Sequence, residues 1–127
     1  MKKLKKGFSF IELIVVITII AILSVAGMIS YGSVSMKSRD SRRISDLEKM
    51  RMALEMARQL GTTYPATATA LVPTYLEKIP ADPKNVNYFY TQLSGGYKYT
   101  IWAKVEDPSL ATGSYGGGSY NYQVSNP

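Results

Sequence analysis

Residues Phe8 to Ile29 have the sequence FSFIELIVVITIIAILSVAGMI, and this stretch decides the fold. It contains no proline and a single charged side chain, Glu12. A helix of this length would span about 33 Å, enough to cross the hydrocarbon core of a bilayer. Its apolar residues cover every side of the helix rather than one stripe. That pattern is typical of a segment that contacts lipid or lies in a crowded helical core.

The charges are distributed unevenly along the chain. Four of the fifteen Lys and Arg residues lie in the first seven positions, ahead of the apolar stretch. Without these seven residues, eleven cations and nine acids remain, a net charge of +2 against +6 for all 127 residues. Residues 8–127 therefore lack the strong basic charge of a nucleic-acid-binding protein, and nucleic acid is not predicted as a partner.

The chain contains neither cysteine nor histidine. A disulfide framework, a thiol nucleophile and a thiolate metal site are therefore excluded, and the commonest general base is missing. Asp82, Glu106 and Asp107 are candidates for a calcium site, but the sequence around them has no dense ladder of oxygen ligands. No catalytic residue, cofactor or metal site is predicted.

Glu12 separates the possible interpretations of the apolar stretch. A carboxylate in hydrocarbon costs about 2.5–3.5 kcal/mol on insertion scales, and such residues are usually functional and paired. A secretory signal peptide cleaved after Ser24-Val25-Ala26 would explain the basic start and the apolar run. So would a plain membrane anchor. Neither gives Glu12 a role, but both stay open as alternatives.

The sequence MKKLKK followed by GFSFIELIVVI resembles the leader and processing site of type IV prepilins and type II secretion pseudopilins. The resemblance implies that a prepilin peptidase cleaves after Gly7 and methylates the new N-terminal residue, Phe8. It places Glu12 at the family's acidic position, where the carboxylate can neutralise the α-amine of Phe8 in its own subunit or in a neighbour. Polymerisation would use the apolar helix, including Ile11, Leu13 and Val16.

The resemblance further implies a structural subunit rather than an enzyme. This would be a prepilin that forms a homo-oligomeric helical filament, a type IV-like pilus. Its partners would be prepilin peptidase, the inner-membrane assembly platform and, before assembly, membrane lipid. It would span the bacterial cytoplasmic membrane once, leader inside and domain outside, and then enter a cell-surface or periplasmic filament. The alternatives are a major pseudopilin of a type II secretion system, a DNA-uptake pseudopilin and a membrane-anchored binding domain.

Helical character continues beyond the apolar stretch. Between Ser35 and Leu60 there is no glycine or proline, and good helix formers dominate. Gly61 is expected to end the helix as its C′ residue. Apolar residues recur at steps of three or four and predict one buried face, formed by Ile44, Leu47, Met50, Leu54, Ala57 and Leu60.

A basic cluster follows the apolar stretch and consists of Lys37, Arg39, Arg42 and Arg43. We expect it to form a solvated helix face or a collar facing the lipid headgroups. The alternatives are contact with acids of another subunit and capture of DNA.

The remaining residues predict a connection and then a small sheet. Residues 62–85 contain four prolines and indicate a surface connection with one short helical turn near Ala68–Leu76. Strands are expected at Val86–Leu93, Tyr97–Val105 and Tyr120–Val124, with a Gly-Gly turn between the first two. The glycine-rich residues 113–118 are expected to form a flexible loop.

These patterns predict an α+β fold. A long N-terminal helix, with a membrane half and an amphipathic half, would pack on a small antiparallel three-stranded sheet, as in the pilin fold. The expected organisation is a leader at 1–7, a transmembrane and polymerisation helix at 8–34, and a globular domain at 35–127. That domain would comprise an amphipathic helix at 35–61, a connection at 62–85 and a sheet at 86–125.

Overall fold

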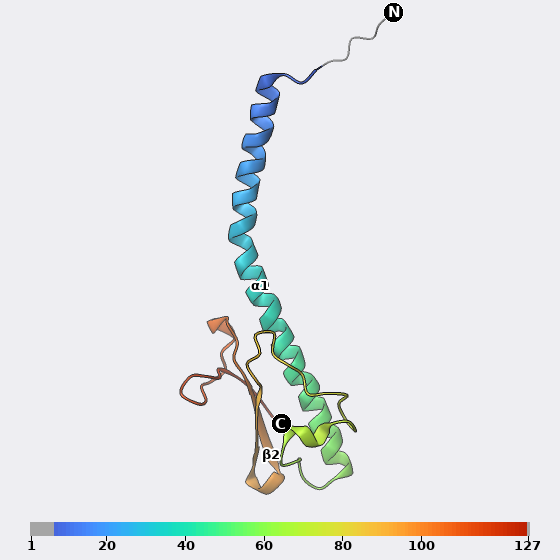
Figure 1. Cartoon of the computed structure of the whole chain (residues 1–127). Helices are drawn as coiled ribbons and strands as arrows, with labels where there is room; N and C mark the ends of the chain where they lie inside the picture. Colours follow the sequence, from blue (N-terminus) through green and yellow to red (C-terminus); the bar gives the residue numbers. More distant parts are fainter. Residues whose placement is uncertain (1–6, 127) are drawn as a thin grey trace, which may run out of the picture. The chain divides into compact units, whose positions relative to one another are not determined.

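A computed structural model describes residues 7–126, apart from the side chain of Ile29. Residues 1–6 of the predicted leader lie outside this range. One helix, α1 (Phe10–Leu60), precedes three strands (Figure 1). The strands are β1 (Phe89–Leu93), β2 (Lys98–Ala103) and β3 (Tyr122–Ser125). The predicted α+β fold, a long N-terminal helix with a small antiparallel sheet, is confirmed.

The chain divides into two compact units, the first ending at Ser35 and the second beginning at Met36. In the first unit, every side chain described from Phe8 to Val34 is exposed. Within the described residues, α1 is the one helix whose length and composition would allow it to cross a membrane. The first unit therefore has no core of its own, and its apolar surface is available to lipid or to other protein.

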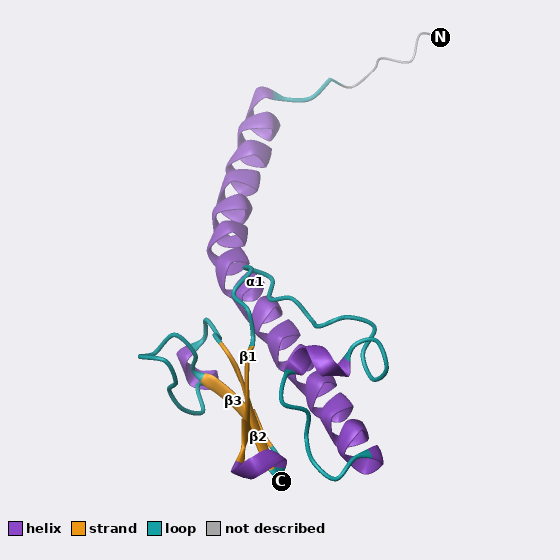
Figure 2. Cartoon of the chain, turned by 60° about the horizontal axis from the view of Figure 1, so that its bottom comes forward, coloured by secondary structure: helices purple, strands orange, loops and turns teal. Residues whose placement is uncertain are grey.

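The second unit has a core between one face of α1 and the sheet (Figure 2). The predicted helix stripe is confirmed at four positions: Leu47, Met50, Leu54 and Ala57 are buried. Ile44 is only half-buried. Leu60 was wrongly placed in this face: it is 81% exposed, because it is the last helical residue and the packed stripe ends one turn earlier.

The sheet is antiparallel, in the order β1-β2-β3. Alternate residues of β2 point to the helix, because side chains alternate between the two faces of a strand. Tyr99, Ile101 and Ala103 are fully buried there, and Val124 of β3 lies opposite Ile101. The strands are shorter than predicted. Tyr97, expected to begin the second strand, is 60% exposed because it belongs to the turn that precedes β2.

The other face of β2 is covered where Trp102 lies. Tyr115 stacks on the Trp102 ring at 5.5 Å between centroids and on Phe89 at 4.7 Å. Trp102 is consequently only 8% exposed. The glycine-rich segment, expected to be a flexible loop, forms a turn closed by a bridge between Tyr115 and Tyr120. Alternation within a strand does not predict this cover, because it comes from a loop that follows the strand.

The helix ends where the sequence predicts, but Gly61 is not a left-handed cap. Its amide donates to the carbonyl oxygen of Ala57 at 3.0 Å, and its φ lies outside the positive region. The connection that follows contains one 3-10 turn, η1 (Ala68–Leu71), which places Leu71 in the core. The predicted helical turn is therefore present and shorter than expected.

Candidate assembly site

The start of α1 is stabilised by a local hydrogen bond to Glu12. The Glu12 carboxylate accepts the backbone N–H of Ser9 at 2.8 Å, while the Ser9 carbonyl accepts the Leu13 N–H at 3.2 Å. An acid three residues after the N-cap, bonded back to the cap amide, is half of a capping box. Negative charge in the first turn also complements the helix dipole. Glu12 thus has a partner within its own chain, which the S-x-x-E spacing of Ser9 and Glu12 could have predicted.

Gly7 and Phe8 precede the helix and are exposed. A β-carbon built on Gly7 would meet no atom within 4 Å. Within the described residues, packing does not require a glycine at this position.

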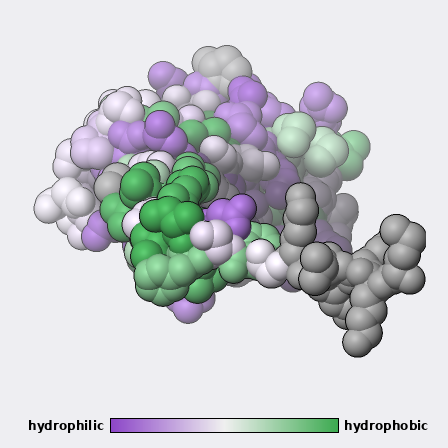
Figure 3. All heavy atoms as spheres, turned by 90° about the horizontal axis from the view of Figure 1, so that it is seen from above, coloured by the Kyte–Doolittle hydropathy of each residue, from purple (hydrophilic) through white to green (hydrophobic). Residues whose placement is uncertain are grey.

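The predicted assembly residues lie on an exposed apolar surface. Phe8, Ile11, Glu12 and Val16 border one shallow hollow, whereas Leu13 is exposed outside its lining. In Figure 3 the hydrophobic residues (green) gather at this N-terminal end of the helix. The structure therefore brings four of the five predicted assembly residues together.

Two hydroxyl groups within the apolar stretch, those of Thr18 and Ser24, are satisfied by their own helix. Thr18 donates to the Ile14 carbonyl at 2.9 Å, and Ser24 donates to the Ile20 carbonyl at 2.8 Å. These bonds lower the cost of placing hydroxyl groups in an apolar medium. Glu12 is the charged residue of the stretch, so its carboxylate dominates the electrostatics of any apolar contact made there.

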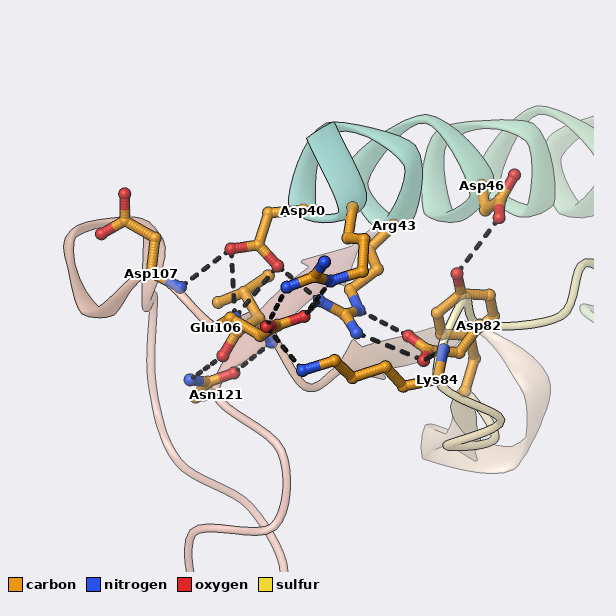
Figure 4. A network of polar contacts seen from close by, with 11 residues as sticks. Asp40, Arg43, Asp46, Asp82, Lys84, Glu106, Asp107 and Asn121 are labelled. Atoms are coloured by element: carbon orange, nitrogen blue, oxygen red, sulfur yellow. Dashed lines mark hydrogen bonds and ion pairs between the residues drawn. The ribbon is translucent and has the colours of Figure 1, made fainter. Parts of the chain in front are cut away.

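The second unit contains a buried ion network centred on Arg43 (Figure 4). Arg43 is only 1% exposed. Its guanidinium donates to Asp82 at 2.5 Å, to Asp40 at 2.6 Å and to Glu106 at 2.8 Å. Three carboxylates from separate parts of the chain therefore meet one helix cation.

Further bonds connect this network to the segment after β2. Arg39 holds Glu106 with two hydrogen bonds of 2.8 and 2.7 Å, and Lys84 donates to the same carboxylate at 2.8 Å. Asp40 accepts the backbone N–H groups of Glu106 and Asp107, the latter at 2.8 Å. The network thus fastens two loops to α1.

The network also shifts the acidity of its carboxyl groups. Hydrogen bonds from Arg39 and Lys84 hold the pKa of Glu106 well below its usual range. Burial by itself would raise the pKa of Asp82, but the bonds from Arg43 and from the Lys84 amide bring that pKa below its ordinary value. Both acids are therefore stabilised in the charged form by the folded chain.

The predicted solvated collar is wrong for two of its four members. Arg43 is buried and Arg39 is paired with Glu106, whereas Lys37 and Arg42 are exposed. A signal was present in the sequence: Asp40 and Arg43 continue the spacing of the buried stripe toward the N-terminus. A charge in phase with a core stripe indicates a buried ion pair, but its partners come from loops that helical spacing cannot identify.

The calcium candidates have other partners. Asp82 and Glu106 bind Arg43, and Asp107 accepts the amide and hydroxyl of Ser109 at 2.9 and 2.7 Å. Over residues 7–126, no group of three or more His, Cys, Asp or Glu side chains is arranged to hold a metal ion. The guanidinium of Arg43 lies between Asp82 and Glu106 and supplies their positive charge.

Comparison with known proteins identifies the N-terminal segment. Residues 2–28 match the family described as the prokaryotic N-terminal methylation motif. The type IV major fimbrial protein FimA of Dichelobacter nodosus is 42% identical over 55 residues, which are 43% of this chain and 35% of that protein. A second FimA from the same organism is 42% identical over the same length, covering 34% of its chain. No solved structure matched the chain.

The matched residues comprise a basic start and an apolar segment with one early glutamate, Glu12, and they carry the methylation motif. The N-terminal segment therefore carries the methylation motif and is similar to type IV major fimbrial proteins. The match spans about a third of the length of the curated relatives. Those relatives are fimbrial proteins, a structural class rather than enzymes.

Replacing Arg43 with methionine is expected to destabilise the fold by about 3–5 kcal/mol, because buried carboxylates lose their counter-charge. The exposed neighbour Arg42, changed to methionine, is the matched control and should stay within about 0.5 kcal/mol of the parent. Urea unfolding of the full chain in detergent, followed by fluorescence of Trp102, measures both. A loss below about 1 kcal/mol in the Arg43→Met variant would show that the network contributes little.

The stability of the second unit should fall in acid. Asp82 and Glu106 have ordinary pKa values of 3.8 and 4.5, and both are lowered on folding. A carboxylate whose pKa is lowered stabilises the fold above its unfolded pKa, and this contribution disappears as the pH falls. The urea midpoint should be nearly constant between about pH 8 and 5.5 and decline below about pH 4.5. The Arg43→Met variant should show a flatter decline; an equally steep one would assign the acid sensitivity to other groups.

Proposed function

We propose that this chain is the structural subunit of a type IV-like pilus. The observation that carries the proposal is the methylation motif over residues 2–28, placed on an exposed apolar helix whose early charged residue is Glu12. The similarity to type IV major fimbrial proteins supports a pilus subunit. In this function the chain carries out no reaction itself. It is processed, held in the membrane and built with identical copies into a helical filament.

Processing begins at the bond between Gly7 and Phe8. This bond lies before the first helical residue, and both residues are exposed, so a membrane-embedded prepilin peptidase can bind it without unwinding α1. The exposed Gly7 has no packing partner that would require glycine, which favours selection by the peptidase. Cleavage leaves an α-ammonium group on Phe8, which the same enzyme methylates.

Glu12 then acts in assembly. One of its carboxylate oxygens is bonded to the Ser9 amide, and the other is available for a cation. The ammonium of Phe8, in the same subunit or in a neighbour, is the charge created next to it by cleavage. An ion pair in an apolar medium is far more favourable than two separate charges. Pairing between subunits would favour one register of the helices over its alternatives.

The membrane stores the subunit before assembly. We place the chain once across the cytoplasmic membrane, with the leader inside and the second unit outside, where the inner-membrane assembly platform takes it up. Exposed apolar residues from Phe8 to Val25 then exchange lipid for the helical core of the filament. Because both surroundings are apolar, this exchange avoids exposing the helix to water.

Intact-mass measurement tests the processing step. Protein from cells with prepilin peptidase should have the mass of a chain that begins at methylated Phe8, and protein from cells without it should keep the leader. The same measurement separates the alternatives. A chain beginning at Gly27 would establish a secretory signal peptide, and an uncut chain in both strains would establish a simple anchor.

Changing Glu12 tests the assembly step. Glu12→Gln keeps an oxygen for the Ser9 amide but removes the charge. We therefore expect α1 to form and the filament yield to fall by about tenfold or more. A tenfold fall corresponds to a loss of about 1.4 kcal/mol per subunit contact. Glu77→Gln, an exposed acid of the second unit, should assemble normally. Sheared filaments quantified against total membrane subunit measure the yield. Normal assembly of Glu12→Gln would mean that the carboxylate serves only as a helix cap.

A further inference from the structure

The second unit carries an open apolar groove on the helix face that the sheet does not cover. α1 contributes Met52 and Met56, and the connection contributes Tyr75 and Leu76. The groove has a volume of about 550 Å³ and a mainly apolar lining. Met52 is 56% exposed and Met56 is 46% exposed, although each is a large apolar side chain in a well-formed helix. We call this surface the Met groove.

The charged residues around the Met groove are paired with their own chain. Lys49 binds Asp46 at 3.2 Å, and Arg51 binds Glu48 at 2.8 Å. Glu55 accepts the buried hydroxyl groups of Tyr64 and Tyr99 at 2.9 and 3.2 Å. The groove therefore offers an apolar floor whose bordering charged groups are already ion-paired or hydrogen-bonded within their own chain, which suits an uncharged apolar segment better than an acidic or basic peptide.

The groove is too small to hold a separate partner by itself. Seven residues line it, whereas a standard protein interface uses about 20–30 residues on each side. Its occupant must therefore be held in place by additional contacts. A subunit of the same polymer meets this condition, because each copy is fixed by several neighbours and a weak contact is repeated along the filament.

We propose that the Met groove binds the apolar helix segment 13–25 of a second copy of this chain. This inference rests on the proposed function. The segment is exposed in its own chain, carries no charge and needs apolar cover outside the membrane. Methionine side chains are flexible and adapt to the Ile, Leu and Val side chains of such a helix. The polymerisation surface thus consists of two parts, the helix segment of one copy and the Met groove of another.

Cysteine cross-linking tests the contact, and the absence of native cysteine makes the background clean. Met52→Cys is combined in turn with one cysteine at each position from Leu13 to Val25, and purified filaments are oxidised with copper phenanthroline. Denaturing gels should show a ladder of covalent multimers. The reactive partner positions should recur every three or four residues, because one face of the bound helix lies against the groove. Met56→Cys should give the same pattern shifted along the helix.

The controls separate this inference from the proposed function. Leu93→Cys, an exposed apolar residue of β1 away from the groove, should give no ladder with the same partner positions. Adding Glu12→Gln to the Met52→Cys pairs should weaken the ladder, relative to total membrane subunit, by the same factor of about ten as the filament yield, since cross-linking requires assembly. Filaments that form but give no ladder at any position with Met52→Cys or Met56→Cys would overturn the Met groove contact and leave the pilus function standing. A parent chain that makes no filaments would overturn both.

Discussion

The apolar surface of the first unit is the constraint on which the rest depends. From Phe8 to Val25 the helix exposes residue after residue of Ile, Leu and Val, with no core of its own. Burying one such side chain is worth about 1.5–3 kcal/mol, so this helix in water would cost more than a small domain can supply. It must lie in lipid or among other apolar helices. Membrane storage and polymerisation are the two ways of meeting that demand.

The second unit has only a small apolar core. Its sheet has three short strands, and its apolar core occupies only the part of α1 between Leu47 and Ala57. On the N-terminal side of Leu47, the same helix face carries Asp40 and Arg43. There a buried ion pair takes the place of apolar packing. The cost of burying Arg43 is offset because Asp82, Asp40 and Glu106 all accept hydrogen bonds from its guanidinium. This network also fixes the course of the two loops that supply the acids.

One helix therefore meets three kinds of surroundings. In the proposed function its first part contacts lipid or other copies. One face of its second part contacts the sheet, and the face with Met52 and Met56 is left uncovered by its own chain. The second unit leaves an apolar face uncovered, and the first unit is an uncovered apolar helix. Each needs apolar cover that the other can provide. In a polymer of identical subunits, each can bury the other without any additional protein.

The sequence alone was enough to predict the helix, its end at Leu60, the α+β class and the membrane-length segment with Glu12. These depend on local properties: composition, the spacing of apolar residues and a short motif. The tertiary structure alone decided that Asp82 and Glu106 pair with Arg43, that Tyr115 covers Trp102 and that Leu60 is exposed. Each of these depends on which residues distant in sequence become neighbours. Helical spacing reports the side of the helix on which a residue lies, whereas its partner is set by the path of the loops.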